Sequence, residues 1–243
     1  MAQAFDLGAH ASRYLAVGTL RLGELRDAIA NAWEQHGTRE SEILSGLTPL
    51  ERALYDRFLK PGDRILLAGC GSGRDLIALL KLGYDVDGLD IAPRSVVVAR
   101  QMLERQGLVA NVYTAPIEAF ALPGRYDVVV FSWCCYGYIP QSESRIGVLR
   151  TVKDHLNPGG RILIAYTPAG RPPRALRLGL MRFSAWMARS DWNPELGDDV
   201  WPGVDGIHYE HRFSAGEFEA EARAAGLAVT FHEMEEGVAV LTM

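Results

Sequence analysis

Hydrophobic positions from Arg64 onward follow two spacings in turn, a short continuous apolar run and a 3.6-residue helical repeat. The apolar runs predict five buried strands, which we place at residues 64–69, 85–90, 110–115, 126–133 and 161–168. The helical repeats predict helices between them, at residues 74–82, 93–106 and 142–156, the last one stopped by the breaker at 157–160. Strands that alternate with helices of this length indicate a parallel sheet with helices on both faces.

The C-terminal residues depart from this alternation. A helix begins at Ser214, which forms a capping box with Glu217. Two strand-like runs follow, at 227–234 and 237–243, and their connection is so short that they must pair antiparallel. A parallel sheet that ends in an antiparallel hairpin strand is a more specific pattern than a generic doubly wound fold.

Two segments lie outside the predicted sheet. The N-terminal segment carries an apolar helical stripe that includes Leu25 and Trp33, and a second helix with Thr48 as N-cap and Glu51 at the capping-box position. The other segment is an insert of about forty residues between the fifth strand and the last helix. It is far longer than an ordinary connection, which indicates a function of its own.

The insert contains an apolar helical repeat interspersed with arginines, at Leu176, Leu180, Phe183 and Met187. One interpretation is a basic amphipathic helix that lies on a membrane. The acidic run that follows favours a second interpretation, in which the insert is a lid that covers a substrate pocket. A contact between two copies of the chain is a further alternative. Three tryptophans of the insert suit an apolar or aromatic substrate, namely Trp186, Trp192 and Trp201.

Composition narrows the class of protein. A chain of 243 residues that is 48% hydrophobic can bury a sizeable core, and its net charge of −5 does not indicate bulk attraction to nucleic acid. Three cysteines do not make a disulfide framework, which suggests a reducing compartment. The N-terminal residues do not resemble a signal peptide, and no apolar run approaches the roughly 20 residues of a membrane span. We therefore expect a cytoplasmic protein without stable membrane insertion.

A glycine-rich loop joins the first predicted strand to the first helix. Gly69, Gly71 and Gly73 follow the pattern G-x-G-x-G, which lets the chain turn sharply and lets a ligand approach backbone N–H groups. Asp90 ends the second strand, 21 positions after Gly69, where a carboxylate can accept hydrogen bonds from ribose hydroxyls. The loop and Asp90 together predict a ribose-bearing ligand. A dinucleotide fingerprint has its third glycine one residue later.

These motifs resemble those of class I S-adenosylmethionine-dependent methyltransferases. The matching stretches are "LLAGCGSGRD", "VDGLDIAP", "YDVVVFSW", "LNPGGRILIAY" and the closing hairpin, over roughly 50–166 and 211–243. The resemblance implies a three-layer Rossmann-like fold with a mostly parallel seven-stranded sheet and an antiparallel C-terminal hairpin strand, and S-adenosylmethionine as cofactor. We expect a single domain made of an N-terminal helical cap, a cofactor-binding core, a lid insert and a C-terminal helix with hairpin, at 1–60, 64–168, 169–210 and 211–243.

The resemblance also implies which residues bind the cofactor. The glycine loop, including Cys70, would pass beneath the methionine part, Asp90 would hold the ribose, and Ile91 would pack on the adenine. Many relatives carry an aspartate after the third strand that accepts from the adenine amino group, where this chain has Ala115 and Pro116. Water, a backbone carbonyl or Glu118 would bind the amino group instead, and the N–H of Ile117 would still reach the adenine ring. Arg74 either reaches the cofactor's carboxylate or is a solvated side chain. Ser132 and Trp133 would lie beside the sulfonium methyl.

Acceptor-binding residues are expected where the fourth strand ends and where the insert rejoins the core. Cys134 and Cys135 have no partner at zinc-binding spacing, so we expect one to pack as a small hydrophobe and the other to line the pocket, with no metal. Histidine near its usual pKa is a suitable base at pH 7, although capping or solvated roles are equally compatible with the pattern. The candidates for orienting or deprotonating the acceptor are His208, His211, Tyr209 and Tyr136.

The predicted function is methyl transfer to an oxygen or nitrogen atom of a small, partly apolar or aromatic acceptor. Non-methyl group transfer from the same cofactor is one alternative. A cofactor-binding regulatory or scaffold protein without catalysis is the other. Nucleic acid is not expected as a partner, and a homodimer is left open.

Overall fold

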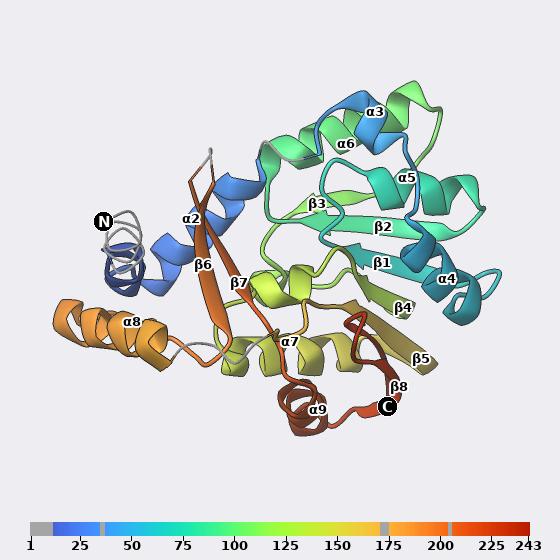
Figure 1. The fold of residues 1–243 in the computed structure, drawn as a ribbon. Helices are drawn as coiled ribbons and strands as arrows, with labels where there is room; N and C mark the ends of the chain where they lie inside the picture. The colour runs from blue at the N-terminus through green and yellow to red at the C-terminus, as the bar shows by residue number, and fades with distance from the viewer. Residues whose placement is uncertain (1–11, 35–36, 171–174, 204–205) are drawn as a thin grey trace.

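The structure is a computed structural model that describes residues 12–34, 37–170, 175–203 and 206–243 (Figure 1). A seven-stranded sheet with strand order β3-β2-β1-β4-β5-β9-β8 forms its centre. The strands are β1 (Arg64–Ala68), β2 (Asp85–Asp90), β3 (Val112–Thr114), β4 (Tyr126–Phe131), β5 (Leu156–Ala165), β8 (Ala228–Glu233) and β9 (Val238–Thr242). The neighbours from β3 to β5 pair parallel, whereas β9 pairs antiparallel with both β5 and β8. The predicted fold class, including the antiparallel hairpin strand, is confirmed.

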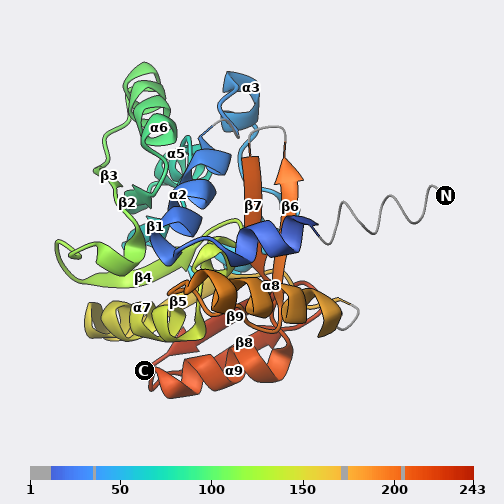
Figure 2. The same ribbon diagram turned by 90° about the vertical axis from the view of Figure 1, so that its left-hand side faces the viewer.

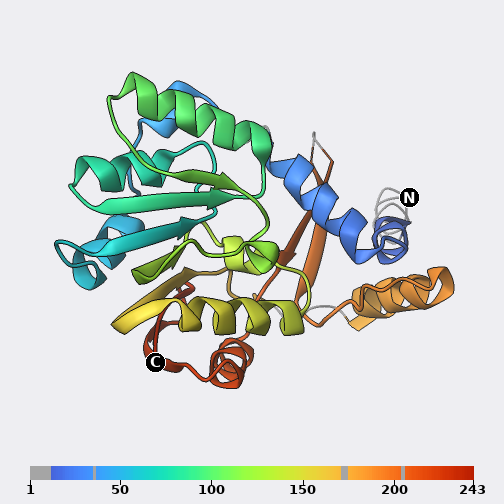
Figure 3. The ribbon, with the colours of Figure 1, turned by 180° about the vertical axis from the view of Figure 1, so that it is seen from behind.

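Helices cover both faces of the sheet, as Figures 1 and 3 show. One face carries α4 (Pro49–Phe58), α5 (Arg74–Lys81) and α6 (Pro93–Arg105), and the other carries α7 (Ser142–Asp154) and α9 (Ala215–Ala224). Alternate residues of β1 belong to two separate cores, with Leu66 on the α7 side and Leu67 on the α5 side. Because both faces are buried, the central strands read as continuous apolar runs, which explains why the sequence locates them well.

Two predicted strand limits are wrong. β3 is shorter than expected, and β5 begins at Leu156, before the breaker at 157–160 rather than after it. Tyr126 pairs with Leu156, and the register then shifts between Tyr126 and Val128, so the extra residues form an irregularity inside the strand. Gly159, with φ of +77°, adopts a backbone conformation that other residues rarely take.

The insert forms α8 (Ala175–Ala188) and a two-stranded hairpin of β6 (Asp198–Gly203) and β7 (Gly206–His211). The helix was expected, but the hairpin was not, because polar residues and a glycine interrupt its apolar pattern. A third core joins the insert to the N-terminal helices; its buried members include Leu25 of α2 (Leu22–Trp33), Met181 and Tyr209. Figure 2 shows α8 beside the helical residues 12–18, outside the layers of the sheet.

None of the helices that the structure describes combines the length and apolar character of a membrane span. The helix α8 does expose large apolar side chains, with Trp186 72% and Leu176 69% accessible. The opposite face of α8 is buried: Met181 belongs to the third core, and Ala185 is also buried.

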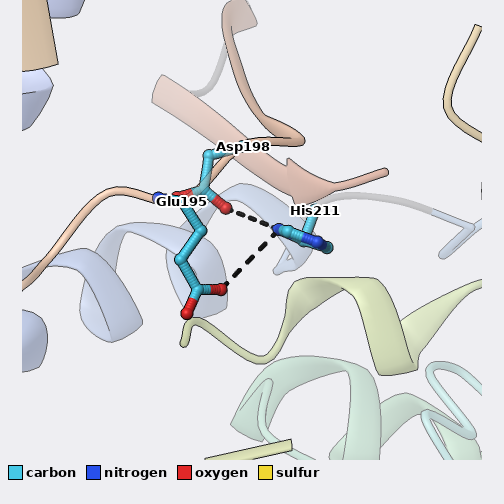
Figure 4. A group of neighbouring side chains, drawn as sticks. All are labelled: Glu195, Asp198 and His211. Atoms are coloured by element: carbon cyan, nitrogen blue, oxygen red, sulfur yellow. Dashed lines mark hydrogen bonds and ion pairs between the residues drawn. The ribbon is translucent and has the colours of Figure 1, made fainter. Parts of the chain in front are cut away.

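A buried polar network attaches the hairpin to α7 and α9. The guanidinium of Arg145, which is fully buried, donates to Glu221 from Nη2 at 2.7 Å and to Glu195 at 2.9 Å. His211 is also fully buried; its Nδ1 lies 2.8 Å from Asp198, and its Nε2 lies 3.0 Å from Glu217. Figure 4 shows Glu195, Asp198 and His211 converging from the loop before β6 and from the two strands.

The two carboxylates determine the charge of His211. Burial alone would lower the pKa of its imidazole, but the hydrogen bonds with Asp198 and Glu217 outweigh it and raise the pKa to about 9. Both ring nitrogens therefore carry protons at neutral pH, and each proton is donated to a carboxylate. Charge-assisted hydrogen bonds of this kind are stronger than neutral ones, and they fix the hairpin against α9.

Stability should consequently decrease with rising pH. The folded pKa of His211 lies above the unfolded value near 6.5, so its contribution is complete below pH 6.5 and is lost as the pH rises through 9. The loss is on the order of 3 kcal/mol. Urea unfolding between pH 6 and 8 measures the larger part of this loss, below the pH at which the thiols of the unfolded chain ionise. The control variant His155→Gln, at the end of α7, should show the same loss as the wild type, whereas His211→Gln should not. A wild-type stability that stays constant over this pH range would contradict the raised pKa of His211.

Candidate functional site

A cavity of about 620 Å³ opens at the carboxyl ends of β1, β2 and β4. Parallel sheets bind ligands at this edge, where the strand order reverses between β1 and β4. The cavity extends from the glycine loop across to α2 and to the short 3₁₀ helix η2 (Cys135–Tyr138). One continuous space therefore touches both the predicted cofactor-binding residues and the start of the predicted acceptor region.

The glycine loop lines this cavity with backbone. The N–H groups of Gly69 and Cys70 both donate to the carbonyl of Leu89, which holds the loop between β1 and β2. A Cβ on Gly69 would lie 2.7 Å from the Cβ of Cys135, so only glycine fits there. A Cβ on Gly71 would meet no protein atom within 4 Å. Gly71 thus presents bare backbone to open space, as a close-lying ligand requires. Gly73 ends the loop as the N-cap of α5.

Asp90 lies at the end of β2, beside the loop. Its Oδ2 accepts from the N–H of Gly71 at 2.7 Å, and its Oδ1 accepts from the N–H of Ala92 at 2.8 Å. Burial raises the pKa of this carboxyl, and the backbone N–H donors oppose that shift. Each oxygen retains a second lone pair, so the carboxylate can still accept from two adjacent hydroxyls, which fits a ribose.

The opposite side of the cavity is formed by Ile91, Pro116, Ile117 and Glu118. The N–H of Ala115 donates to the carbonyl of Asp90, which holds this segment beside the end of β2. The carboxylate of Glu118 accepts from Arg26 of α2 at 3.2 Å. Apolar side chains with one carboxylate suit an adenine ring, and Glu118, one of the expected substitutes for the usual aspartate, lies here.

Ser132 and Arg74 line the other end, where the methionine part is expected. Ser132 Oγ donates to Asp75 Oδ2 at 2.6 Å. The guanidinium of Arg74 is paired with Glu51 of α4 and lies over the ring of Trp133, 4.9 Å from its centre. Arg74 is therefore neither a solvated side chain nor an unpaired anion receptor.

The residues after β4 form a tight turn instead of the extended strand end that we expected. Trp133 and Cys134 have φ values of +47° and +60°, and the N–H of Cys135 donates to the carbonyl of Ser132. Positive φ at both central residues characterises a type I′ turn and is uncommon for these residue types. Such strain is typical of functional sites.

The thiol of Cys135 packs on Gly69 and donates to the carbonyl of Ala68. Burial raises the pKa of the thiols of both Cys134 and Cys135.

Three of the four predicted acceptor residues lie in the core and do not line the cavity. Tyr136 donates to Glu221 at 2.8 Å, and Tyr209 donates to Asp198 at 2.7 Å; burial raises the pKa of both phenols. His211 is protonated and bonded on both nitrogens, so it is not a base at pH 7. The turn into η2 directs Tyr136 inward, and the hairpin places Tyr209 and His211 in its packed interior.

The fourth, His208, lies one layer behind the cavity. Its ring stacks on Trp201 of β6 at 5.4 Å and meets the ring of Trp33 edge-on at 6.2 Å. Trp33 itself lines the cavity, and so does Tyr138, 4.9 Å from it. The sequence showed Trp33 only as part of a helical stripe and Glu51 only as a cap, so the place of Trp33 at the cavity and the ion pair of Glu51 with Arg74 were missed.

Glu195, Asp198 and His211 bring one potential metal ligand atom each to within 4.8 Å of the others (Figure 4). Their hydrogen bonds point to a structural role. Arg145 donates to Glu195, Tyr209 donates to Asp198, and both nitrogens of His211 are bonded to carboxylates. Both ring nitrogens of His211 therefore already have a carboxylate partner.

Comparisons with known proteins agree with this geometry. Residues 65–160 match the profile of a family described as "Methyltransferase domain". A ubiquinone biosynthesis O-methyltransferase of Cereibacter sphaeroides is 30% identical over 164 residues, 65% of this chain and 62% of the relative. A protein of the same name from Xanthomonas campestris pv. campestris is 28% identical over 158 residues, 63% of each chain. The chain thus spans less than two thirds of the length of these relatives.

Solved structures show the same fold at lower identity. A SAM-dependent methyltransferase from Methanosarcina mazei superposes with a TM-score of 0.62 at 19% identity, over 81% of this chain and 97% of that one. The glycopeptide N-methyltransferase MtfA, crystallised with S-adenosylmethionine, gives 0.56 at 17% identity, over 79% and 84%. Residues 65–160 thus match a methyltransferase domain, and the sheet order gives the chain the fold of S-adenosylmethionine-dependent methyltransferases.

Proposed function

We propose that this protein transfers the methyl group of S-adenosylmethionine to an oxygen or nitrogen atom of a small, partly aromatic acceptor. The observation that carries the proposal is that one cavity is lined by the glycine loop and Asp90 and also by Trp33 and Tyr138. The relatives named O-methyltransferase and the neighbour named N-methyltransferase support both acceptor atoms.

The bound cofactor would supply an electrophilic methyl group on a positively charged sulfur. The chain's part is to place the two reactants in line, because much of the catalysis of such a displacement comes from orientation. Gly69, Gly71 and Asp90 would hold the cofactor, and Ser132 and Trp133 would border the methyl group. The strained turn at Trp133 keeps the backbone of this border close to the glycine loop.

The acceptor would lie between α2 and η2. Trp33 and Tyr138 form an aromatic wall there, and Ile29, Ile139 and Pro140 complete its apolar lining. Burial raises the pKa of the Tyr138 phenol, and the nearby Glu210 adds to the shift, so the hydroxyl stays protonated and acts as a hydrogen-bond donor. Within the described residues no histidine lines the cavity, which favours catalysis by placement over general-base catalysis.

The insert would act as a fixed wall as well as a lid. Its hairpin supports Trp33 through the stack of Trp201 and His208, and the polar network of Arg145 and His211 attaches that hairpin to the core. On this proposal the four predicted parts of the chain form one domain, with the cap and the insert jointly enclosing the acceptor.

Transfer of isotope from S-adenosylmethionine labelled in the methyl group, tested on phenols, catechols and amines, distinguishes the candidate functions. Label in the acceptor supports the proposal. Consumption of the cofactor without methyl transfer would identify non-methyl group transfer. Binding without turnover on a broad panel would indicate a regulatory protein, and absence of cofactor binding would overturn the proposal.

The Asp90→Ala variant should bind S-adenosylhomocysteine about 10- to 100-fold more weakly, because ribose hydroxyls would lose their acceptor. Isothermal titration calorimetry measures the change. The matched control is Asp85→Ala, which removes an exposed carboxylate at the far end of the same strand and should leave the dissociation constant unchanged. An unchanged constant for Asp90→Ala would move the ribose contact elsewhere.

His208 should act on the acceptor through Trp33. The His208→Phe variant keeps an aromatic ring against Trp201 and Trp33, so its kcat and KM should stay close to wild type. The His208→Ala variant loses the ring and should raise the acceptor KM several-fold, in line with about 1 kcal/mol per aromatic contact. Steady-state kinetics across pH separates the roles, since loss of kcat in both variants with an altered pH profile would instead identify His208 as a base.

A further inference from the structure

The end of the cavity near Ser132 contains more negative than positive charge. The guanidinium of Arg74 is ion-paired with Glu51 and lies 2.7 Å from Asp75 Oδ1, so one cation serves two carboxylates. The three side chains are 22%, 14% and 4% exposed, in the order Arg74, Glu51 and Asp75. Water therefore screens the excess negative charge poorly, and a cation would be bound favourably there.

The hydrogen bonding of this cluster is also incomplete. Asp75 Oδ2 accepts from Ser132. Asp75 Oδ1 touches only the ion-paired Arg74 and makes no hydrogen bond of good geometry, and Ser72 Oγ makes none within the described chain. Asp75 and Ser72 are 3% and 6% exposed, and both line the cavity. Buried polar atoms in native proteins are almost always hydrogen-bonded, so two such atoms beside one cavity point to a ligand that carries hydrogen-bonding groups.

We propose that Asp75, supported by Glu51 and Arg74, binds the α-ammonium group of the cofactor's methionine. This inference rests on the proposed function, since it assigns one end of the same cavity. An ammonium group offers three N–H donors and one positive charge, which would satisfy Asp75 Oδ1 and offset the excess carboxylate. The side chain of Arg74 is then a positioning group held by two carboxylates, in contrast to the expectation that it receives the cofactor's carboxylate.

Glu51 connects this subsite to the N-terminal cap. One oxygen of its carboxylate accepts from the N–H of Thr48 at 2.7 Å and closes the capping box of α4, while the other is bonded to Arg74. Tyr55 of the same helix lies fully buried beside Asp75 and Ser132, and burial raises the pKa of its phenol well above the usual value. The helix α4 therefore contributes charge to the cofactor site in addition to covering the sheet.

Calorimetry with three adenosine ligands tests the proposal. S-Adenosylhomocysteine carries the complete amino-acid tail, its deamino analogue has hydrogen in place of the α-amino group, and 5′-methylthioadenosine lacks the tail. The Asp75→Asn variant should bind S-adenosylhomocysteine about 10- to 100-fold more weakly than wild type, the effect of losing a charged hydrogen bond. Its affinity for the other two ligands should stay near the wild-type value.

The matched control is Asp56→Asn, which removes an exposed carboxylate of α4 and should leave all three affinities unchanged. Equal losses for S-adenosylhomocysteine and the deamino analogue, or no loss at all, would overturn the assignment of Asp75 while leaving the proposed function intact. Wild-type protein that binds none of the three ligands would overturn the proposed function itself.

If Asp75→Asn does not fold, Glu51→Gln provides the second test. Glutamine can keep the capping box with Thr48 but removes one negative charge from Arg74. A selective, smaller loss for S-adenosylhomocysteine supports the proposal, and a loss shared by all three ligands contradicts it.

Discussion

The hydrogen bonds accepted by Asp90 are the constraint on which the cofactor end of the molecule depends. One carboxylate joins the N–H of Gly71 in the glycine loop to the N–H of Ala92 at the start of α6. It therefore fixes the ends of two adjacent strands relative to each other before any ligand binds. The same oxygens keep lone pairs toward the cavity. A single side chain thus shapes the loop and also provides the group that recognises a ribose.

The insert shows how a segment outside the sheet becomes part of a site. None of the described side chains of its hairpin lines the cavity, yet the stack of Trp201 and His208 stands directly behind Trp33. The apolar wall therefore depends on contacts between residues more than 170 positions apart. Because His211 and Arg145 hold the hairpin through buried charged hydrogen bonds, the wall is attached to the layer of α7 and α9.

Two clusters of charge in this protein differ in how complete their hydrogen bonds are. In the cluster around His211, each ring nitrogen faces a carboxylate and Glu195 is bonded to Arg145, which is what a structural network requires. In the cluster around Asp75, one carboxylate oxygen has only an ion pair with Arg74 and the buried hydroxyl of Ser72 has no hydrogen bond. The incomplete hydrogen bonds around Asp75 are what distinguish a proposed binding site from a support.

The sequence by itself determined the parallel sheet, its antiparallel last strand, the glycine loop and Asp90, because each depends on local period or on residues at fixed distances along the chain. It did not determine the start of β5. Glycines usually end a strand, but in this protein they lie inside β5, where the pairing register shifts. It also did not reveal that the side chains of His211, Tyr209 and Tyr136, whose residue types suit catalysis, are directed into the core. Only the tertiary structure could decide this, because the direction of a side chain depends on turns such as Trp133–Cys134 and on partners such as Glu217 and Glu221, which periodicity does not reveal.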